Sequence, residues 1–206
     1  MQLYTVGHST VPIETFIDLI KQYDVQYVID VRSTPYSRYA SQFNTDVLES
    51  ALKSEGIGYS HMGRYFGARQ ESREFYNVEG YLDFELFRES ELFKKGLRNI
   101  EHGLEKYNIA LMCTEKDPID CHRAIMVGRG FELDGIPVKH ILHSGEVLEQ
   151  DGLNRRLLDM YFPDRAQTSL FDDGADEAEL LAEAYRLRNK EIGYRPNDES
   201  EEGDAE

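Results

Sequence analysis

The sequence contains little that would suit a secreted or membrane-bound protein. It has only two cysteines in 206 residues, Cys113 and Cys121, too few for the disulfide framework of a small secreted domain. No stretch approaches the roughly 20 consecutive apolar residues that a membrane-spanning helix needs, and the segment 1–8 lacks the basic start and apolar run of a signal peptide. We therefore expect a cytoplasmic protein with reduced thiols and no membrane partner.

Basic residues are scarce as well. The formal net charge is −16, and residues 171–206 contribute 13 acidic but only 4 basic side chains. An acidic chain repels nucleic-acid phosphates over most of its surface, so non-specific binding to nucleic acid is unfavourable. Any anion site in this protein must therefore be a local basic pocket.

Short apolar runs alternate with amphipathic segments along most of the chain. Runs typical of buried strands occupy 3–6, 25–31, 57–62, 108–113 and 136–142. Segments with helical periodicity occupy 12–23, 44–55, 81–107 with a break near Ser90 or Gly96, 121–133 and 153–161. This alternation predicts an α/β fold over residues 1–166, with a mostly parallel five-stranded sheet and helices on both faces.

Chemically reactive side chains follow the carboxyl end of every predicted strand. Open α/β sheets bind ligands in the crevice at that edge, and the right-handed crossover rule brings all the loops that follow strands to it. Several basic side chains meeting there on an acidic domain would form a focused positive pocket. The candidates for catalysis are His8, Cys113, Glu115, Cys121 and His122, and the candidates for holding a phosphate or another oxyanion are Arg32, Arg38, Arg64, Lys116 and Arg123.

The segment 109–123 concentrates this chemistry. An apolar run ends at Cys113, a polar loop broken by Pro118 follows, and helical periodicity begins at Cys121. A thiol at a helix N-terminus beside a histidine and an arginine has a lowered pKa, so Cys121 is the stronger candidate for a reactive thiolate. Cys113 is equally well explained as a small buried hydrophobe. Taken alone, the arginines after the second strand are explained by ion pairs with surface acids.

Two mechanisms fit these residues. In the first, a cysteine is the nucleophile, His8 or His122 transfers protons, and the arginines hold a phosphoryl or similar group, as in a Cys/His-dependent hydrolase or transferase. In the second, both cysteines and one or two histidines hold a zinc ion. The spacing Cys-x7-Cys-His is not a standard zinc pattern, so we predict no cofactor and rank zinc below thiol chemistry.

Four motifs resemble one known family. They are VGHST at 6–10, IDVR at 29–32 with Pro35 and the Ser-Arg pair at 37–38, QFN at 42–44, and MCTEKDP at 112–118 continuing to CHR at 121–123. Over about residues 3–145 they resemble the family of domains of unknown function numbered 488. The resemblance implies an intracellular α/β domain of prokaryotic type, without a settled reaction. Where that family often has Leu-Gly-Gly, this chain has Tyr-Phe-Gly at 65–67. The key positions that it implies are His8, Arg32, Arg38, Cys113, Glu115, Cys121, His122 and Arg123.

A weaker likeness connects the chain to rhodaneses. They also carry an Ile-Asp-Val-Arg strand and a later turn in which a strand, a cysteine, a loop and a helix follow one another. The loop from Cys113 to Arg123 is too long for the rhodanese cradle, so the likeness is an analogy only.

The segment 167–171, Gln-Thr-Ser-Leu-Phe, resembles the bacterial sliding-clamp-binding motif. Leu170 and Phe171 would fill an apolar pocket of the clamp, while Gln167 would anchor the extended peptide by hydrogen bonds. The alternative is that Leu170 and Phe171 pack back on the domain as a C-terminal latch. In the acidic tail, 172–206, residues 175–190 have the pattern of a helix, and 197–206 are too acidic to pack.

These features together suggest a cytoplasmic protein of DNA maintenance or repair. It would be tethered to the DNA sliding clamp, and its crevice would bind or act on a phosphate-bearing group of a nucleotide or of DNA. A thiol enzyme of small-molecule or sulfur-transfer chemistry is one alternative, and a non-catalytic binding module is another.

Overall fold

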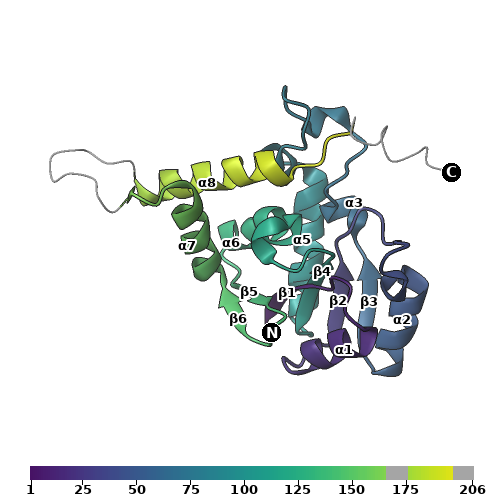
Figure 1. The fold of residues 1–206 in the computed structure, drawn as a ribbon. Helices are drawn as coiled ribbons and strands as arrows, with labels where there is room; N and C mark the ends of the chain where they lie inside the picture. Colours follow the sequence, from purple (N-terminus) through teal and green to yellow (C-terminus); the bar gives the residue numbers. More distant parts are fainter. Residues whose placement is uncertain (166–175, 197–206) are drawn as a thin grey trace.

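A computed structural model describes residues 1–165 and 176–196 (Figure 1). The segment 167–171, for which we predict clamp binding, and the acidic end 197–206 lie outside the described residues. The predictions made for those two segments therefore stay predictions.

One sheet of six strands forms the centre of the fold, in the order β3-β2-β4-β1-β5-β6. The first five strands are parallel, and β6 runs antiparallel to β5. The predicted α/β fold with a mostly parallel sheet is confirmed. The sixth strand escaped prediction because a strand of three residues is too short to show a period. The strands are β1 Leu3–Gly7, β2 Tyr27–Asp30, β3 Gly58–His61, β4 Ile109–Cys113, β5 Val138–Ile141 and β6 Val147–Glu149.

Strand β4 is the most deeply placed, and all five of its residues are buried. Its side chains alternate between two apolar cores, as the period of a strand requires. Ile109, Leu111 and Cys113 belong to the larger core, whereas Ala110 and Met112 belong to the smaller one. The thiol of Cys113 therefore points to the face of the sheet that the larger core covers.

Helices cover both faces of the sheet (Figure 1). The smaller core contains buried residues of α1 (Ile13–Lys21) and α2 (Thr45–Ser54). The larger core contains buried residues of the remaining helices and of a π-helix, η4, which precedes α6. These elements are α3 Gly63–Phe66, α4 Phe84–Arg88, α5 Glu91–Leu104, η4 Arg123–Gly128, α6 Arg129–Leu133, α7 Gln150–Tyr161 and α8 Glu177–Ile192.

The predicted break in the helix 81–107 occurs at Ser90 and not at Gly96. The Ser90 side chain accepts a hydrogen bond from the Phe93 N–H, 3.2 Å away, and so caps the N-terminus of α5. Gly96 lies inside α5, where a Cβ atom would come within 2.7 Å of the Phe66 ring. This glycine serves close packing and does not end a helix.

The C-terminal helix is part of the folded unit. The helix predicted over 175–190 is present as α8, and Ala184 and Tyr185 are buried in the larger core. The Tyr185 hydroxyl donates to Asn154 at 2.6 Å and accepts a hydrogen bond from the Gln150 amide at 2.8 Å. Buried polar contacts of this kind define one way of packing α8 against α7.

His140 extends this polar network into the sheet. Its Nε2 lies 2.9 Å from Gln150 Oε1, and its Nδ1 lies 2.8 Å from the Thr5 hydroxyl. An amide oxygen only accepts, so Nε2 carries the proton and Nδ1 accepts one from Thr5. Burial, together with the charge of Arg123, lowers the pKa of His140 to about 3.

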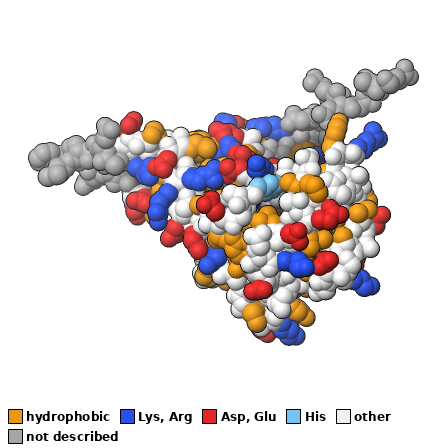
Figure 2. All heavy atoms as spheres, turned by 60° about the horizontal axis from the view of Figure 1, so that its bottom comes forward, with side chains coloured by type: hydrophobic (Ala, Val, Ile, Leu, Met, Phe, Trp, Pro, Cys, Tyr) orange, Lys and Arg blue, Asp and Glu red, His pale blue; other side chains and the backbone are white. Residues whose placement is uncertain are grey.

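Within the described part of the chain, no helix combines the length and the apolar character that crossing a membrane requires. Figure 2 shows one face of the molecule, on which acidic and basic side chains are interspersed with apolar ones.

We predict that the free energy of unfolding falls as the pH drops below 6.5. The unfolded chain binds a proton on His140 near pH 6.5, whereas the folded chain does so only near pH 3. Each such histidine removes about 1.4 kcal/mol per pH unit in this interval. Because the unfolded histidine is half protonated at pH 6.5, His140 alone should make urea unfolding at pH 6.5 and pH 5 differ by about 1.6 kcal/mol.

The matched variants are His140→Gln, which should reduce this difference, and His102→Gln, which should preserve it because that side chain is 71% exposed. Equal stability of the wild type at both pH values would contradict the prediction.

Candidate functional site

The candidate site lies where β1 and β4 end, at the carboxyl edge of the sheet. These two strands are neighbours, but the chain leaves them toward opposite faces, through α1 after β1 and through η4 after β4. Such a divergence opens a crevice between the two loops, and open α/β sheets bind their ligands there.

The loop after β4 is held against the end of β1. The N–H groups of His8 and Ser9 donate to the carbonyl oxygens of Cys113 (2.9 Å) and Thr114 (2.8 Å). A Cβ atom at Gly7 would lie 1.9 Å from the Glu115 carbonyl oxygen. Only glycine permits this approach, so Gly7 sets the depth at which the loop lies.

The same loop is held from its other side by residues that the sequence did not reveal as part of the site. The carboxylate of Asp117 caps the 3-10 turn η3 (Pro118–Asp120) and binds Arg156 of α7 through two hydrogen bonds, of 3.0 and 2.7 Å. Arg188 of α8 donates to the Ile119 carbonyl at 2.9 Å and forms an ion pair with Asp120. Both arginines lie on the polar sides of amphipathic helices, where sequence patterns do not single them out.

The turn η3 brings the two cysteines together. Both thiols donate to the same carboxylate oxygen, Glu115 Oε2, over 3.3 Å from Cys113 and 3.0 Å from Cys121. The Nδ1 atom of His122 lies 3.7 Å from the first sulfur and 4.0 Å from the second. Four of the five predicted catalytic residues thus form one compact group, which we call the thiol cluster.

The thiol cluster is covered. The exposed fractions of Cys113 and Cys121 are 3% and 1%, whereas Glu115 is exposed as a residue although its carboxylate contacts both sulfurs. The imidazole of His122 is directed by its Nε2–H, which donates to the Val31 carbonyl over 3.1 Å. Its Nδ1 atom therefore faces the sulfurs as an acceptor when the ring is neutral.

Ionisation within the thiol cluster is coupled, because three acids share one small space. Burial and the hydrogen bond to Cys121 raise the pKa of Cys113. Burial alone would raise the pKa of Cys121 too, but the adjacent Cys113 thiol and the positive charge of Arg123 hold that pKa well below its usual value. Burial and the neighbouring Cys121 thiolate raise the pKa of Glu115.

The helix that follows Cys121 differs from the prediction. Cys121 itself is extended, with φ −132° and ψ 135°, and the regular helix begins at Arg123 with a π-helical turn. The Cys121 carbonyl still accepts hydrogen bonds from the N–H groups of Ala124 (3.0 Å) and Ile125 (3.1 Å). The predicted helix 121–133 is therefore present, with its start two residues later. Turns of π-helix are frequent at functional sites.

The fifth predicted catalytic residue, His8, belongs to a separate buried group. Its Nδ1 lies 2.6 Å from the Ser9 carbonyl, its Nε2 lies 3.1 Å from Arg32, and its ring stacks on Phe43 at 4.2 Å between centroids. Burial and the Arg32 charge lower its pKa to about 4. His8 is therefore neutral near pH 7.

The two buried arginines of the predicted anion site are engaged inside the protein. Arg32 binds both carboxylate oxygens of Asp30, at 2.9 and 2.6 Å, and the Phe43 carbonyl at 2.8 Å. Arg123, which is fully buried, donates to the Glu115 carbonyl at 2.6 Å and to the Lys116 carbonyl at 3.3 Å. Both guanidinium groups hold loops of the site in place.

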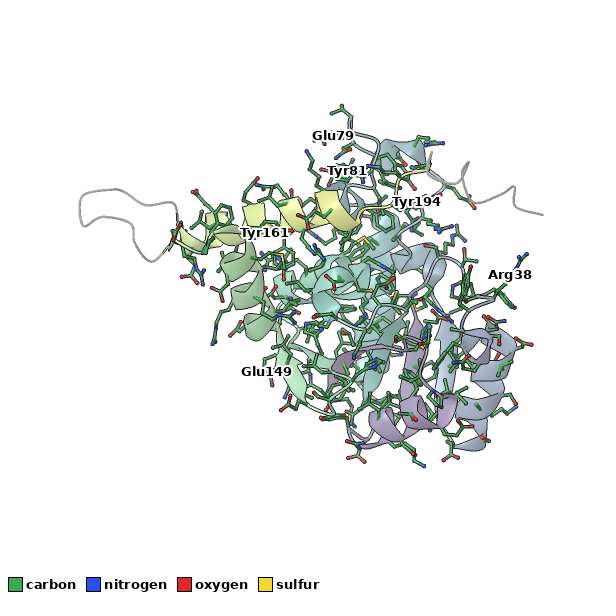
Figure 3. All side chains as sticks on the ribbon, in the orientation of Figure 1. Arg38, Glu79, Tyr81, Glu149, Tyr161 and Tyr194 are labelled. Carbon is green, nitrogen blue, oxygen red and sulfur yellow. The ribbon has the colours of Figure 1, made fainter. Side chains whose placement is uncertain are left out.

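The other predicted anion-binding residues are exposed. No hydrogen bond or ion pair involves the side chains of Arg38, Arg64 or Lys116 within the described residues, and all three reach solvent. Arg38 points away from the molecule on the loop after β2 (Figure 3). The structure therefore does not gather the five predicted basic residues into one pocket.

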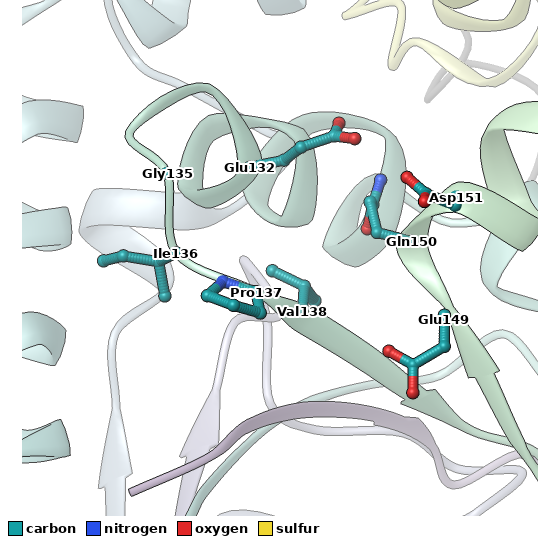
Figure 4. Close-up of a pocket in the computed structure, with 8 residues that line it drawn as sticks. All are labelled: Glu132, Gly135, Ile136, Pro137, Val138, Glu149, Gln150 and Asp151. Carbon is teal, nitrogen blue, oxygen red and sulfur yellow. The ribbon is translucent and has the colours of Figure 1, made fainter.

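Two surface pockets lie at the carboxyl edge of the sheet, and the first of them borders the thiol cluster at Glu115. One, of about 800 Å³, is lined by Glu115, Lys116, His143 and Ser144 among others. The other, of about 580 Å³, is lined by Ser33, Arg64 and Arg69 among others. A further pocket of about 330 Å³ (Figure 4) has an acidic lining that includes Glu132, Glu149 and Asp151, and it lies at the opposite edge, where β5 begins.

We predict that Arg32→Met destabilises the fold by about 3–5 kcal/mol, because it leaves the fully buried Asp30 carboxylate without its cation. Arg38→Met removes the same charge from an exposed position and should cost less than about 0.5 kcal/mol. Urea unfolding of the two variants measures the contrast. Equal free energies of unfolding in the two variants would show that the buried Asp30–Arg32 ion pair contributes little to stability.

Comparison with known proteins places the chain in a family without giving it an activity. No curated protein matches it. A family model described as "Domain of unknown function DUF488" matches residues 12–129, more than half of the chain. The matched part contains the whole thiol cluster and ends before β5. The chain therefore belongs to the DUF488 family, as its four motifs predict.

Proposed function

We propose that this protein acts in DNA maintenance or repair in the cytoplasm. It binds a phosphate-bearing group, on a nucleotide or a nucleic-acid end, at the carboxyl edge of its sheet, and the segment 167–171 tethers it to the DNA sliding clamp.

The observation that carries the phosphate site is the placement of the exposed basic side chains. Arg38 follows β2, Arg64 follows β3 and Lys116 follows β4, so all three lie at the ligand-binding edge of the parallel sheet. Within the described residues none of the three forms a salt bridge, although the pocket that Lys116 lines also includes Glu115, Asp117 and Asp120. On a chain with a net charge of −16, such cations provide the local attraction that a phosphate requires.

The pockets at this edge have suitable dimensions. Volumes of about 580 and 800 Å³ lie within the range of small-molecule and cofactor sites. Each has one of these exposed cations in its lining, Arg64 in the smaller and Lys116 in the larger. His143 and Ser144 add an imidazole and a hydroxyl group to the lining of the larger pocket, and groups of that kind orient a phosphate by hydrogen bonding.

The tether rests on the motif and on the elements that flank it. The described chain stops at Arg165, after α7, and resumes at Asp176, before α8. Both flanking helices pack on the domain and on each other. A clamp that binds the segment between them would hold the phosphate site next to DNA without a long flexible linker.

The thiol enzyme is the weaker candidate. Both sulfurs are almost completely buried beneath Glu115, and a nucleophile must be reachable by its substrate.

We predict that Arg64→Ala and Lys116→Ala each weaken the binding of a 5′-phosphorylated single-stranded oligonucleotide by about 3- to 10-fold, because each removes one phosphate contact. Fluorescence anisotropy at several salt concentrations should also show the salt dependence reduced by about one charge per variant. Arg155→Ala, an exposed arginine of α7, is the matched control. If all three variants lost affinity equally, the overall charge of the protein would explain binding, and the proposed phosphate site would be overturned.

We predict that the double variant Leu170→Ala/Phe171→Ala loses clamp binding by about 100-fold or more, since two apolar anchors leave the clamp pocket. The measurement is surface plasmon resonance, with the purified clamp binding to the immobilised full chain. The control variant, Asp172→Ala/Asp173→Ala, changes the residues that follow the motif and should bind as the wild type does. Unchanged affinity in the Leu170/Phe171 variant would overturn the tether while leaving the phosphate site standing.

A further inference from the structure

We infer that the thiol cluster is a metal site in which Cys113, Glu115, Cys121 and His122 bind one zinc ion. This inference does not depend on the proposed function, because it rests on four ligand atoms and on the charge that surrounds them. The sequence alone ranks zinc binding below thiol chemistry, and the structure favours the opposite ranking.

The ligand atoms of the two cysteines and His122 are close enough together to bind one zinc ion, and the Glu115 carboxylate touches both sulfurs. With Zn–S near 2.3 Å and Zn–N or Zn–O near 2.0 Å, neighbouring ligand atoms lie about 3.3–3.8 Å apart. Glu115 Oε2 lies 3.3 and 3.0 Å from the two sulfurs, and His122 Nδ1 lies 3.7 and 4.0 Å from them. The ligand atoms of Cys113, Cys121 and His122 all lie within 4.8 Å of one another. The Glu115 carboxylate lies outside this close group of three, so its exposed side chain has to turn toward the metal to complete the coordination.

The histidine is already oriented as a ligand. Metal-binding histidines donate their second ring N–H to a carbonyl or carboxylate, which fixes the tautomer and aims the free nitrogen at the metal. His122 makes this bond from Nε2 to the Val31 carbonyl, and its Nδ1 faces the sulfurs. The residue that accepts the bond, Val31, directly follows strand β2, so the end of that strand holds the ring.

The positive charge of Arg123, next to the thiol cluster, would be stabilised by an anionic group. Arg123 is fully buried, its terminal nitrogens bind two carbonyl oxygens, and its Nε has no partner within the described residues. A buried cation that has no anionic partner is unfavourable. Zinc bound by two thiolates, one carboxylate and one neutral imidazole carries a net charge of −1. That complex would neutralise Arg123, which immediately follows His122.

The unusual spacing is explained by the fold. Many structural zinc sites take two cysteines from one tight turn, in the pattern Cys-x2–4-Cys. Here the first cysteine ends a strand, and the turn η3 brings the second one back beside it. The ion pair of Asp117 with Arg156 and the hydrogen bond of Arg188 fix that return. The ligands are thus held in place by tertiary contacts and not by a local motif.

The four ligands differ in their access to solvent. The sulfurs are closed off, whereas Glu115 is the exposed member and borders the 800 Å³ pocket. Its carboxylate is the ligand that water can replace. Catalytic zinc sites with two cysteines and one histidine as protein ligands keep their fourth position open in this way.

We predict that the full chain, expressed with zinc in the medium and purified without chelators, retains about one zinc ion per molecule. Cys113→Ser and Cys121→Ser should each lower the zinc content at least about 10-fold. His102→Ala, at an exposed histidine outside the thiol cluster, should leave it unchanged. Elemental analysis after gel filtration measures the content, and only the folded fraction is counted.

A second measurement on the wild type avoids variants that fail to fold. Cobalt(II) exchanged into the chain should give the intense visible bands of a tetrahedral ion and the near-ultraviolet thiolate bands of two Co–S bonds. A metal-free wild type that alkylates rapidly, a disulfide between Cys113 and Cys121, or a cobalt spectrum without thiolate bands would each overturn the site.

Discussion

The contact between the end of β1 and the loop that follows β4 is the constraint on which the candidate site depends. Gly7 leaves room for the Glu115 carbonyl where a Cβ atom would collide at 1.9 Å, and two backbone hydrogen bonds from His8 and Ser9 lock the loop there. Because the loop cannot lift, the sulfur of Cys113 faces the returning chain, and Cys121 meets it beneath Glu115. The geometry of the site therefore depends on the close contact between the end of β1 and the loop that follows β4.

Polar side chains in this protein divide into those that build the loops and those that remain for a ligand. Arg32 and Arg123 are buried, and their hydrogen bonds go to Asp30 and to backbone carbonyl groups. A buried guanidinium has to be satisfied from within the protein, because water cannot reach it. The exposed cations, such as Arg64 and Lys116, remain available to bind a ligand from solution. A count of basic residues at one edge of a sheet does not distinguish these two roles.

The C-terminal helix connects the thiol cluster with the segment proposed to bind the clamp. Helix α8 is anchored in the core through Tyr185, and Arg188 holds the turn that returns Cys121 to the site. The segment for which we propose clamp binding joins this helix to α7. Stability, the geometry of the thiol cluster and the proposed tether thus share one helix, although it follows the family-matched part of the chain by more than forty residues.

The sequence by itself determined the fold class, the order of the main strands and helices, and the residues that carry the chemistry. Alternating apolar periods reflect which side chains must leave water, and that requirement is local. Four of the five predicted catalytic residues do meet, because they lie on one strand–loop–helix segment. The ligand arrangement of the thiol cluster, the internal engagement of Arg32 and Arg123, and the roles of Arg156 and Arg188 were decided by the tertiary structure alone. They depend on contacts between segments far apart in the chain, such as the hydrogen bond between His122 and Val31, which spans 91 residues. They also depend on burial, which turns an arginine from a ligand for solutes into a support for the backbone.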